Sequence, residues 1–181
     1  MRKLSKIVRG GSLVLIGLAL PLTVTTLAHG PLGSIDDPDL RRRVTQAVQD
    51  TPRYGMFDDV EVSVEDRVVT LSGRVTRSEK KDDIGRRVAK IDGVRQVVNE
   101  IRLLPESRAD DDLRQRVARA IYNHPSFWEY GSMSAPPIHI IVEHGRVRLT
   151  GQVGAELDRS LACALAQVPG ARSVRNDLRV K

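Results

Sequence analysis

The stretch VEVSVEDRVVTLSGRV at residues 60–75 decides the fold of this chain, because it returns as IHIIVEHGRVRLTGQV at residues 138–153. In both copies apolar and polar residues alternate on either side of a short turn. This pattern is typical of two antiparallel strands with one buried face. The 181-residue chain therefore contains an internal repeat.

The residues around the hairpin repeat in the same order. DLRRRVTQAV at residues 39–48 matches DLRQRVARAI at residues 112–121, and both place apolar residues on one helical face. The closing segment GVRQVVNEIRL at residues 93–103 matches GARSVRNDLRV at residues 170–180.

A second helical stripe precedes each closing segment, with Ile84, Val88 and Ile91 in the first copy. Leu161, Leu165 and Val168 take the same places in the second. The pattern predicts two tandem α+β modules, at residues 38–105 and 109–181. Each has the order helix, strand, strand, helix, strand, with two helices packed on a three-stranded sheet.

The two hairpins differ at the turn. The second copy has His144 and Gly145, and glycine accepts the positive φ that a tight hairpin turn needs. The first copy has Arg67 in place of that glycine. We therefore expect a looser turn, or one of another type, in the first copy.

Residues 1–28 have the plan of a secretory signal peptide, with a basic start, an apolar stretch and small residues near Ala28. We expect export to the periplasm and cleavage after Ala28 or Gly30. The alternative is an uncleaved membrane-anchoring helix, since the weakly apolar run is close to the minimum length for a span. No cysteine lies near the cleavage region, so a lipoprotein anchor is excluded.

The composition is that of a folded soluble protein, with 40% hydrophobic and 29% charged residues. The net charge of +6 comes largely from the amino terminus. Removing the four basic residues of the first 28 leaves 25 bases against 23 acids, a net charge of +2. A nucleic-acid partner is not indicated, because the bases are not interleaved with stacking aromatic residues on a strand.

The repeated unit resembles the BON family, named for bacterial osmotically inducible and nodulation proteins. The resemblance rests on the hairpin with Gly73, the closing strand with Asn99, and their counterparts Gly151 and Asn176. It covers nearly all of the chain after the export segment. It implies a periplasmic or outer-membrane-associated module that binds phospholipid or holds envelope proteins together. The missing turn glycine at Arg67 and a longer helix-to-strand connection in the second copy depart from the pattern.

The aromatic residues mark a candidate binding surface. All of them lie in or beside the connections that lead from the first helix of each copy to its hairpin. One interpretation is a loop that inserts Phe127, Trp128 and Tyr130 into a lipid interface. The other is that such rings, Phe57 and Phe127 above all, close the open end of a small core. The full set is Tyr54, Phe57, Tyr122, Phe127, Trp128 and Tyr130.

Arginines on the outer faces of the two first helices are a second candidate surface. Near a membrane they would contact anionic phospholipid headgroups, although a charged helix face is also typical of simple solvent exposure. They are Arg41, Arg42 and Arg43 in the first copy and Arg114, Arg116 and Arg119 in the second.

No motif for catalysis is present. His139 and His144 are expected to face solvent, and Cys163 lies in a helix of small apolar residues without an activating base. We therefore predict no enzyme, no cofactor and no metal.

The sequence favours a non-enzymatic envelope protein that associates with phospholipid membranes and supports envelope integrity or stress tolerance. The alternative is an interaction adaptor that docks an envelope protein, or a second copy of itself, at a free sheet edge.

Overall fold

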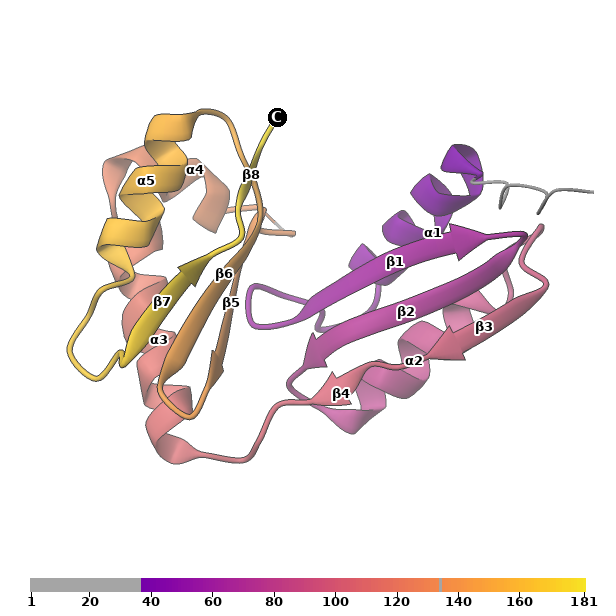
Figure 1. Ribbon diagram of the computed structural model, residues 1–181, viewed down its shortest axis with the longest axis horizontal. Coiled ribbons are helices and arrows are strands. Elements are labelled where there is room, and N and C mark those ends of the chain that lie inside the picture. Colours follow the sequence, from indigo (N-terminus) through magenta and orange to yellow (C-terminus); the bar gives the residue numbers. More distant parts are fainter. Residues whose placement is uncertain (1–36, 134) are drawn as a thin grey trace, which may run out of the picture. The chain divides into compact units, whose positions relative to one another are not determined.

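The computed structural model describes residues 37–133 and 135–181. The expected signal peptide at residues 1–28 lies outside this part of the chain. The described residues form two modules with the same element order, so the predicted α+β fold with two tandem copies is confirmed (Figure 1). In each module a central strand pairs antiparallel with the strand before it and parallel with the closing strand.

The first module packs two helices against one face of its sheet, and the core between the layers is built from their apolar stripes. Leu40, Val44 and Val48 from the first helix are at most 2% exposed. The elements are α1 (Pro38–Gln49), β1 (Asp59–Glu65), β2 (Val68–Val75), α2 (Ser78–Val88), β3 (Gln96–Asn99) and β4 (Arg102–Leu103).

The second module repeats this plan with one addition, a 3₁₀ turn followed by a short helix in the longer connection. In both modules the closing segment forms two short strands, where the sequence predicted a single strand. The elements are α3 (Arg108–Tyr122), η1 (Pro125–Phe127), α4 (Trp128–Gly131), β5 (Ile138–Glu143), β6 (Arg146–Val153), α5 (Glu156–Leu165), β7 (Ser173–Asn176) and β8 (Arg179–Val180).

The two hairpin turns have the same geometry, so the expectation of a different turn in the first module is wrong. Asp66 and Arg67 have φ of 49° and 65°, and His144 and Gly145 have φ of 53° and 76°. Both are two-residue turns with positive φ at each central residue, which suits the twist of a hairpin. Arg67 is held in this conformation by its Nε, which donates to the carbonyl of Gly93 over 2.7 Å.

A glycine near the end of the central strand is required in both modules. A Cβ on Gly73 would lie 2.1 Å from the carbonyl oxygen of Asp59, and one on Gly151 would lie 1.9 Å from that of Pro137. Both glycines have φ above +100°, a region that other residues rarely adopt. Their place in the resemblance therefore has a steric reason.

The repeated asparagines join a helix to the break in the closing strand. Asn99 Nδ2 donates to the carbonyl of Lys81 over 3.0 Å, and its Oδ1 accepts the amide of Ile101. Asn176 makes the same two bonds, to the carbonyl of Arg159 over 2.9 Å and from the amide of Leu178. Each side chain thus fixes the bend after which a buried residue enters the core.

We expect Asn176→Ala to lower the free energy of unfolding by about 1–2 kcal/mol, because the carbonyl of Arg159 and the amide of Leu178 both lose a partner. Chemical denaturation followed by circular dichroism measures the change. Asn123→Ala is the control, since Asn123 is exposed at the end of α3. Equal stability of the two variants would contradict the assigned role.

The first module also contains a buried ion pair that the second lacks. Asp58, 1% exposed, lies 2.6 Å from Nζ of Lys80, which is 8% exposed. Asp58 further accepts the amides of Gly55 and Thr76, over 3.0 and 2.9 Å. Counting from the two matched glycines, the second module has Pro136 and Asp158 at these places, so the fold does not require the pair.

Candidate binding surfaces

Exposed apolar side chains gather at one end of the second module, which we call the apolar end. Val180 pairs with Val153 at the last residue of β6, and Leu157 lies in the first turn of α5, which follows directly. Trp128 starts α4. The hydroxyl of Tyr130, in the same helix, lies close to Gly154 in the connection between β6 and α5, only 3.6 Å from the position that a Cβ on this glycine would take. The exposed fractions are Trp128 73%, Met133 47%, Leu157 77% and Val180 40%.

The core positions α4 so that its tryptophan faces outward. Phe127 is fully buried, and its ring centroid lies 6.0 Å from that of the half-buried Tyr130. Tyr122 donates its hydroxyl hydrogen to the carbonyl of Ile138, and burial raises its pKa. Phe127 therefore closes the core, as the second interpretation of the aromatics expects, while Trp128 lies on the surface.

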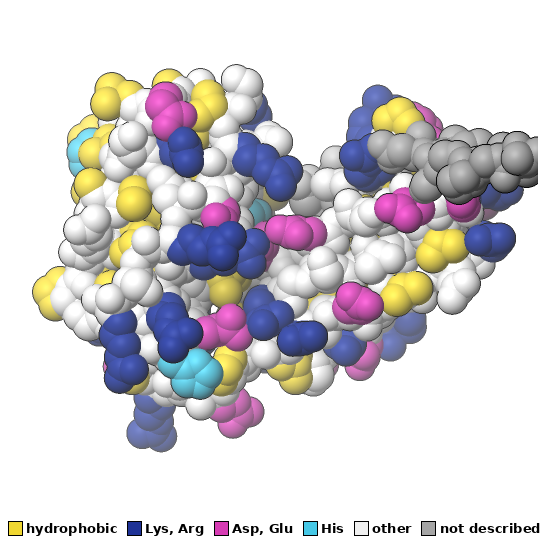
Figure 2. All heavy atoms as spheres, in the orientation of Figure 1, with side chains coloured by type: hydrophobic (Ala, Val, Ile, Leu, Met, Phe, Trp, Pro, Cys, Tyr) yellow, Lys and Arg dark blue, Asp and Glu magenta, His cyan; other side chains and the backbone are white. Residues whose placement is uncertain are grey.

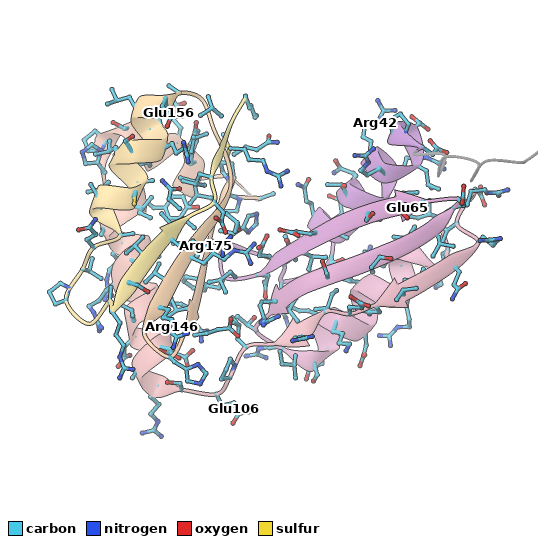
Figure 3. The ribbon with its side chains drawn as sticks, viewed as in Figure 1. Arg42, Glu65, Glu106, Arg146, Glu156 and Arg175 are labelled. Atoms are coloured by element: carbon cyan, nitrogen blue, oxygen red, sulfur yellow. The ribbon has the colours of Figure 1, made fainter. Side chains whose placement is uncertain are left out.

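The apolar end carries charges of both signs. Glu156 forms an ion pair with Arg159 over 2.7 Å, and Glu129 and Lys181 are exposed. Figure 2 shows hydrophobic side chains around these charges at the end of the module where Figure 3 labels Glu156. The surface is thus distinguished by its exposed apolar groups and not by a net charge.

The arginines of the first helices lie in different environments. Arg114 was expected on an outer face, but its side chain is 7% exposed and forms an ion pair with Asp111 over 2.8 Å, so that prediction is wrong. Arg42 pairs with Asp39 over 2.5 Å, and Arg43 donates to the carbonyl of Asp92 over 2.9 Å. Of the others, Arg41 and Arg116 are half-buried and Arg119 is exposed.

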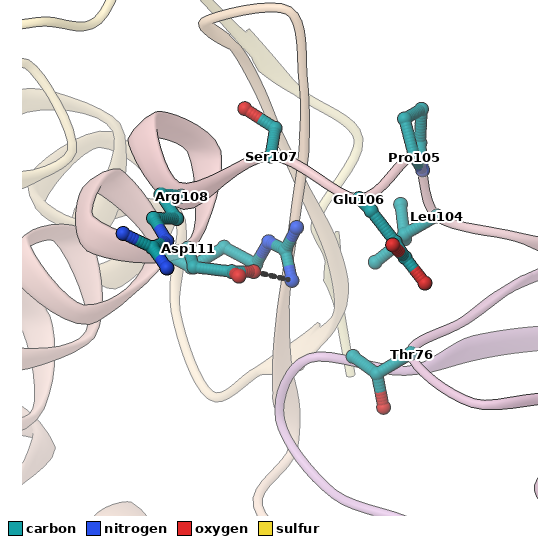
Figure 4. Close-up of a pocket in the computed structure, with 8 residues that line it drawn as sticks. Thr76, Leu104, Pro105, Glu106, Ser107, Arg108 and Asp111 are labelled. Carbon is teal, nitrogen blue, oxygen red and sulfur yellow. Dashed lines mark ion pairs between the residues drawn. The ribbon is translucent and has the colours of Figure 1, made fainter.

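Arg114 lines a hollow of about 370 Å³ at the start of α3, shown in Figure 4. Two acidic side chains, Glu106 and Asp111, and two basic ones, Arg108 and Arg114, line it together with Thr76 and Ser107. Because these charges cancel, the hollow does not favour an ion of either sign.

The connection before β1 covers the outer edge of β5. The carbonyl of Met56 accepts the amide of Ile140 over 2.7 Å, and the carbonyl of Gly55 lies 3.3 Å from Nδ1 of His139. Met56 and Phe57 pack against the core of the second module, not their own. The expectation that Phe57 closes its own core is therefore wrong, as is the expectation that His139 faces solvent.

Ion pairs surround this contact. Arg74 pairs with Glu143 over 2.9 Å, and Arg148 lies 3.2 Å from Glu61 and 3.5 Å from Asp59. Burial raises the pKa of Asp59, and the charges of His139 and Arg148 oppose this change. The contact between the two modules therefore combines apolar packing with ion pairs between their side chains.

Residues 37–133 and 135–181 contain no group of histidine, cysteine and carboxylate side chains that could hold a metal. Cys163 is half-buried and its thiol is free. Within the same residues, no helix has the length and apolar character needed to cross a membrane.

A comparison with family models matches the BON domain twice, at residues 36–105 and 109–181. A comparison with curated proteins gave no significant match. Among solved structures, the C-terminal domain of CdsD, a structural protein of the type III secretion system of Chlamydia trachomatis, aligns over 81% of this chain and all of its own length, with 15% identity and a TM-score of 0.30. A second CdsD structure aligns over 79% of this chain and 92% of its own, with 16% identity and a TM-score of 0.29. These similarities are too weak to support a functional argument.

Proposed function

The chain belongs to the BON domain family, a non-catalytic family, and from this premise we propose that it is an exported, non-enzymatic envelope protein that associates with phospholipid membranes through the apolar end of its second module. One observation carries the proposal. Of the five large apolar side chains that are exposed in the described residues, four lie at this end. The fifth, Leu103, lies on β4 of the first module.

The chemistry of the apolar end suits a lipid interface. An indole ring combines a large apolar surface with one hydrogen-bond donor, and Trp is enriched where headgroups meet acyl chains. Burying a side chain of this size removes it from water at a gain of about 1.5–3 kcal/mol. Lys181, whose amide donates to the carbonyl of Val153 at the same end, supplies positive charge for phosphate groups.

We expect the purified chain to float with vesicles of phosphatidylcholine and phosphatidylglycerol, and the fluorescence of Trp128, the single tryptophan, to shift to the blue. Trp128→Ala should weaken binding about tenfold, since roughly 1.5 kcal/mol of apolar transfer is lost. Leu103→Ser, on the first module, is the control and should float like the native chain. The proposal fails if no lipid concentration produces a shift, or if both variants lose binding equally.

A further inference from the structure

The face of the second module's sheet opposite the helices carries four arginines, which we call the arginine face. Figure 3 labels Arg146 and Arg175 on it, and Figure 2 shows basic side chains over these strands. Arg148 lies opposite Arg175 in the register of β6 and β7, and Arg179 follows on β8.

The fold does not need this charge, as the first module shows. There the positions of Arg146, Arg148 and Arg175 are taken by Val68, Thr70 and Val98, in the same register. Only Arg179 has a basic counterpart, which is Arg102. Two copies with the same topology thus differ on the same face. Arg148 pairs with residues of β1, whereas Arg146, Arg175 and Arg179 form no ion pair with the first module in the described residues.

The cross-strand pair of Arg148 and Arg175 would be unfavourable by itself, because like charges directly opposite each other repel. Asp177 lies between them and accepts from Nε of each over 2.9 Å. The hydrogen bond from Arg175, followed by that from Arg148, keeps the pKa of Asp177 below its usual value. Arg148 also reaches Glu61, whereas the side chain of Arg175 remains 76% exposed.

The same side of the module ends in an unpaired strand edge. β7 and β8 pair only with β6 among the described strands, so their outer edge has no strand beside it. The opposite edge, on β5, is covered by Met56. An uncovered edge offers main-chain donors and acceptors to another extended chain.

We propose that an extended, acidic segment of a partner protein adds to the edge of β7 and β8, with its carboxylates contacting Arg175 and Arg179. Side chains on one face of an added strand repeat about every 6.6–6.8 Å, which lets acids at alternate positions follow the arginines. A guanidinium binds a carboxylate through two parallel hydrogen bonds, which favours arginine over lysine for this task. A membrane is the less suitable ligand here, since it cannot use the main-chain groups of a strand edge.

The test uses the purified whole chain and a fluorescent peptide that alternates glutamate with threonine. We expect binding that weakens with salt, is lost for the same peptide with glutamine in place of glutamate, and is lost when alternate peptide amides are N-methylated. Arg175→Gln combined with Arg179→Gln should weaken binding about tenfold, since exposed ion pairs contribute up to about 1 kcal/mol each.

Arg102→Gln is the matched control and should bind the peptide like the native chain. The proposal is overturned if the glutamine peptide binds equally well, if N-methylation has no effect, or if Arg102→Gln weakens binding as much as the double variant. It is also overturned if the double variant loses vesicle binding while no peptide binds. Trp128→Ala should leave peptide binding unchanged, so this proposal and the membrane proposal fail independently.

Discussion

Gly73→Ala should largely unfold the first module, with a loss of about 4 kcal/mol in its free energy of unfolding. An added Cβ would lie 2.1 Å from the carbonyl oxygen of Asp59, so either β2 moves away from β1 or the residue leaves its φ of +121°. A non-glycine residue at such a φ costs about 1–3 kcal/mol, and forcing atoms into a filled space adds a similar amount. Gly151→Ala should have the same effect on the second module.

Gly55→Ala provides the control, because a Cβ on Gly55 would meet nothing within 4 Å and its φ lies outside the positive range. Its free energy of unfolding should change by less than about 0.5 kcal/mol. Denaturation in urea, followed by circular dichroism, compares the three variants. Native-like stability of Gly73→Ala would show that β2 can separate from β1 at this point without loss, contrary to the steric argument.

Lys80→Met should lower the free energy of unfolding by about 3–5 kcal/mol, because it leaves the carboxylate of Asp58 buried without its counter-charge. Thr76 and Gly55 still donate hydrogen bonds to this carboxylate, but neither carries a charge. The loss should therefore exceed that of a surface lysine by several kcal/mol.

Lys81→Met, at the next position of α2, is the matched control, since Lys81 is only half-buried and its side chain forms no ion pair in the described residues. Urea denaturation of both variants and of the native chain gives the comparison. If Lys80→Met is as stable as Lys81→Met, the ion pair does not hold the first module together. A double change to Lys80→Met and Asp58→Leu should recover part of the loss, because it removes the unpaired charge.

The sequence predicted the two modules because alternation in the hairpins and the stripes of the helices depend on local periodicity. It failed where a contact comes from outside the repeat. Phe57 packs against the core of the other copy, and His139 lies against the carbonyl of Gly55, so neither copy alone indicates these contacts. Arg67 was misjudged because the bond from its side chain to Gly93, which supports its positive φ, joins residues far apart in the chain.

The apolar end was predicted only in part. Trp128 was singled out because aromatics are rare in this chain, and it is indeed exposed. Leu157 continues the helical stripe of Leu161 and Leu165 and would be assigned to the core from its spacing. It is 77% exposed, in the first turn of α5, which begins just beyond the end of β6. Sequence periodicity gives the face of a helix but not how far the sheet extends below it.

The hydrogen bond from the amide of Ile140 to the carbonyl of Met56 joins the two modules at the edge of β5. Ile141, on the side of β5 that faces away from the helices, is only 3% exposed in the whole chain. Without the first module, β5 would expose the unpaired main-chain groups of its edge and the apolar side chain of Ile141 to other molecules. The first module therefore shields part of the second, and a chain shortened to the second module alone would expose an apolar surface that the whole chain keeps covered.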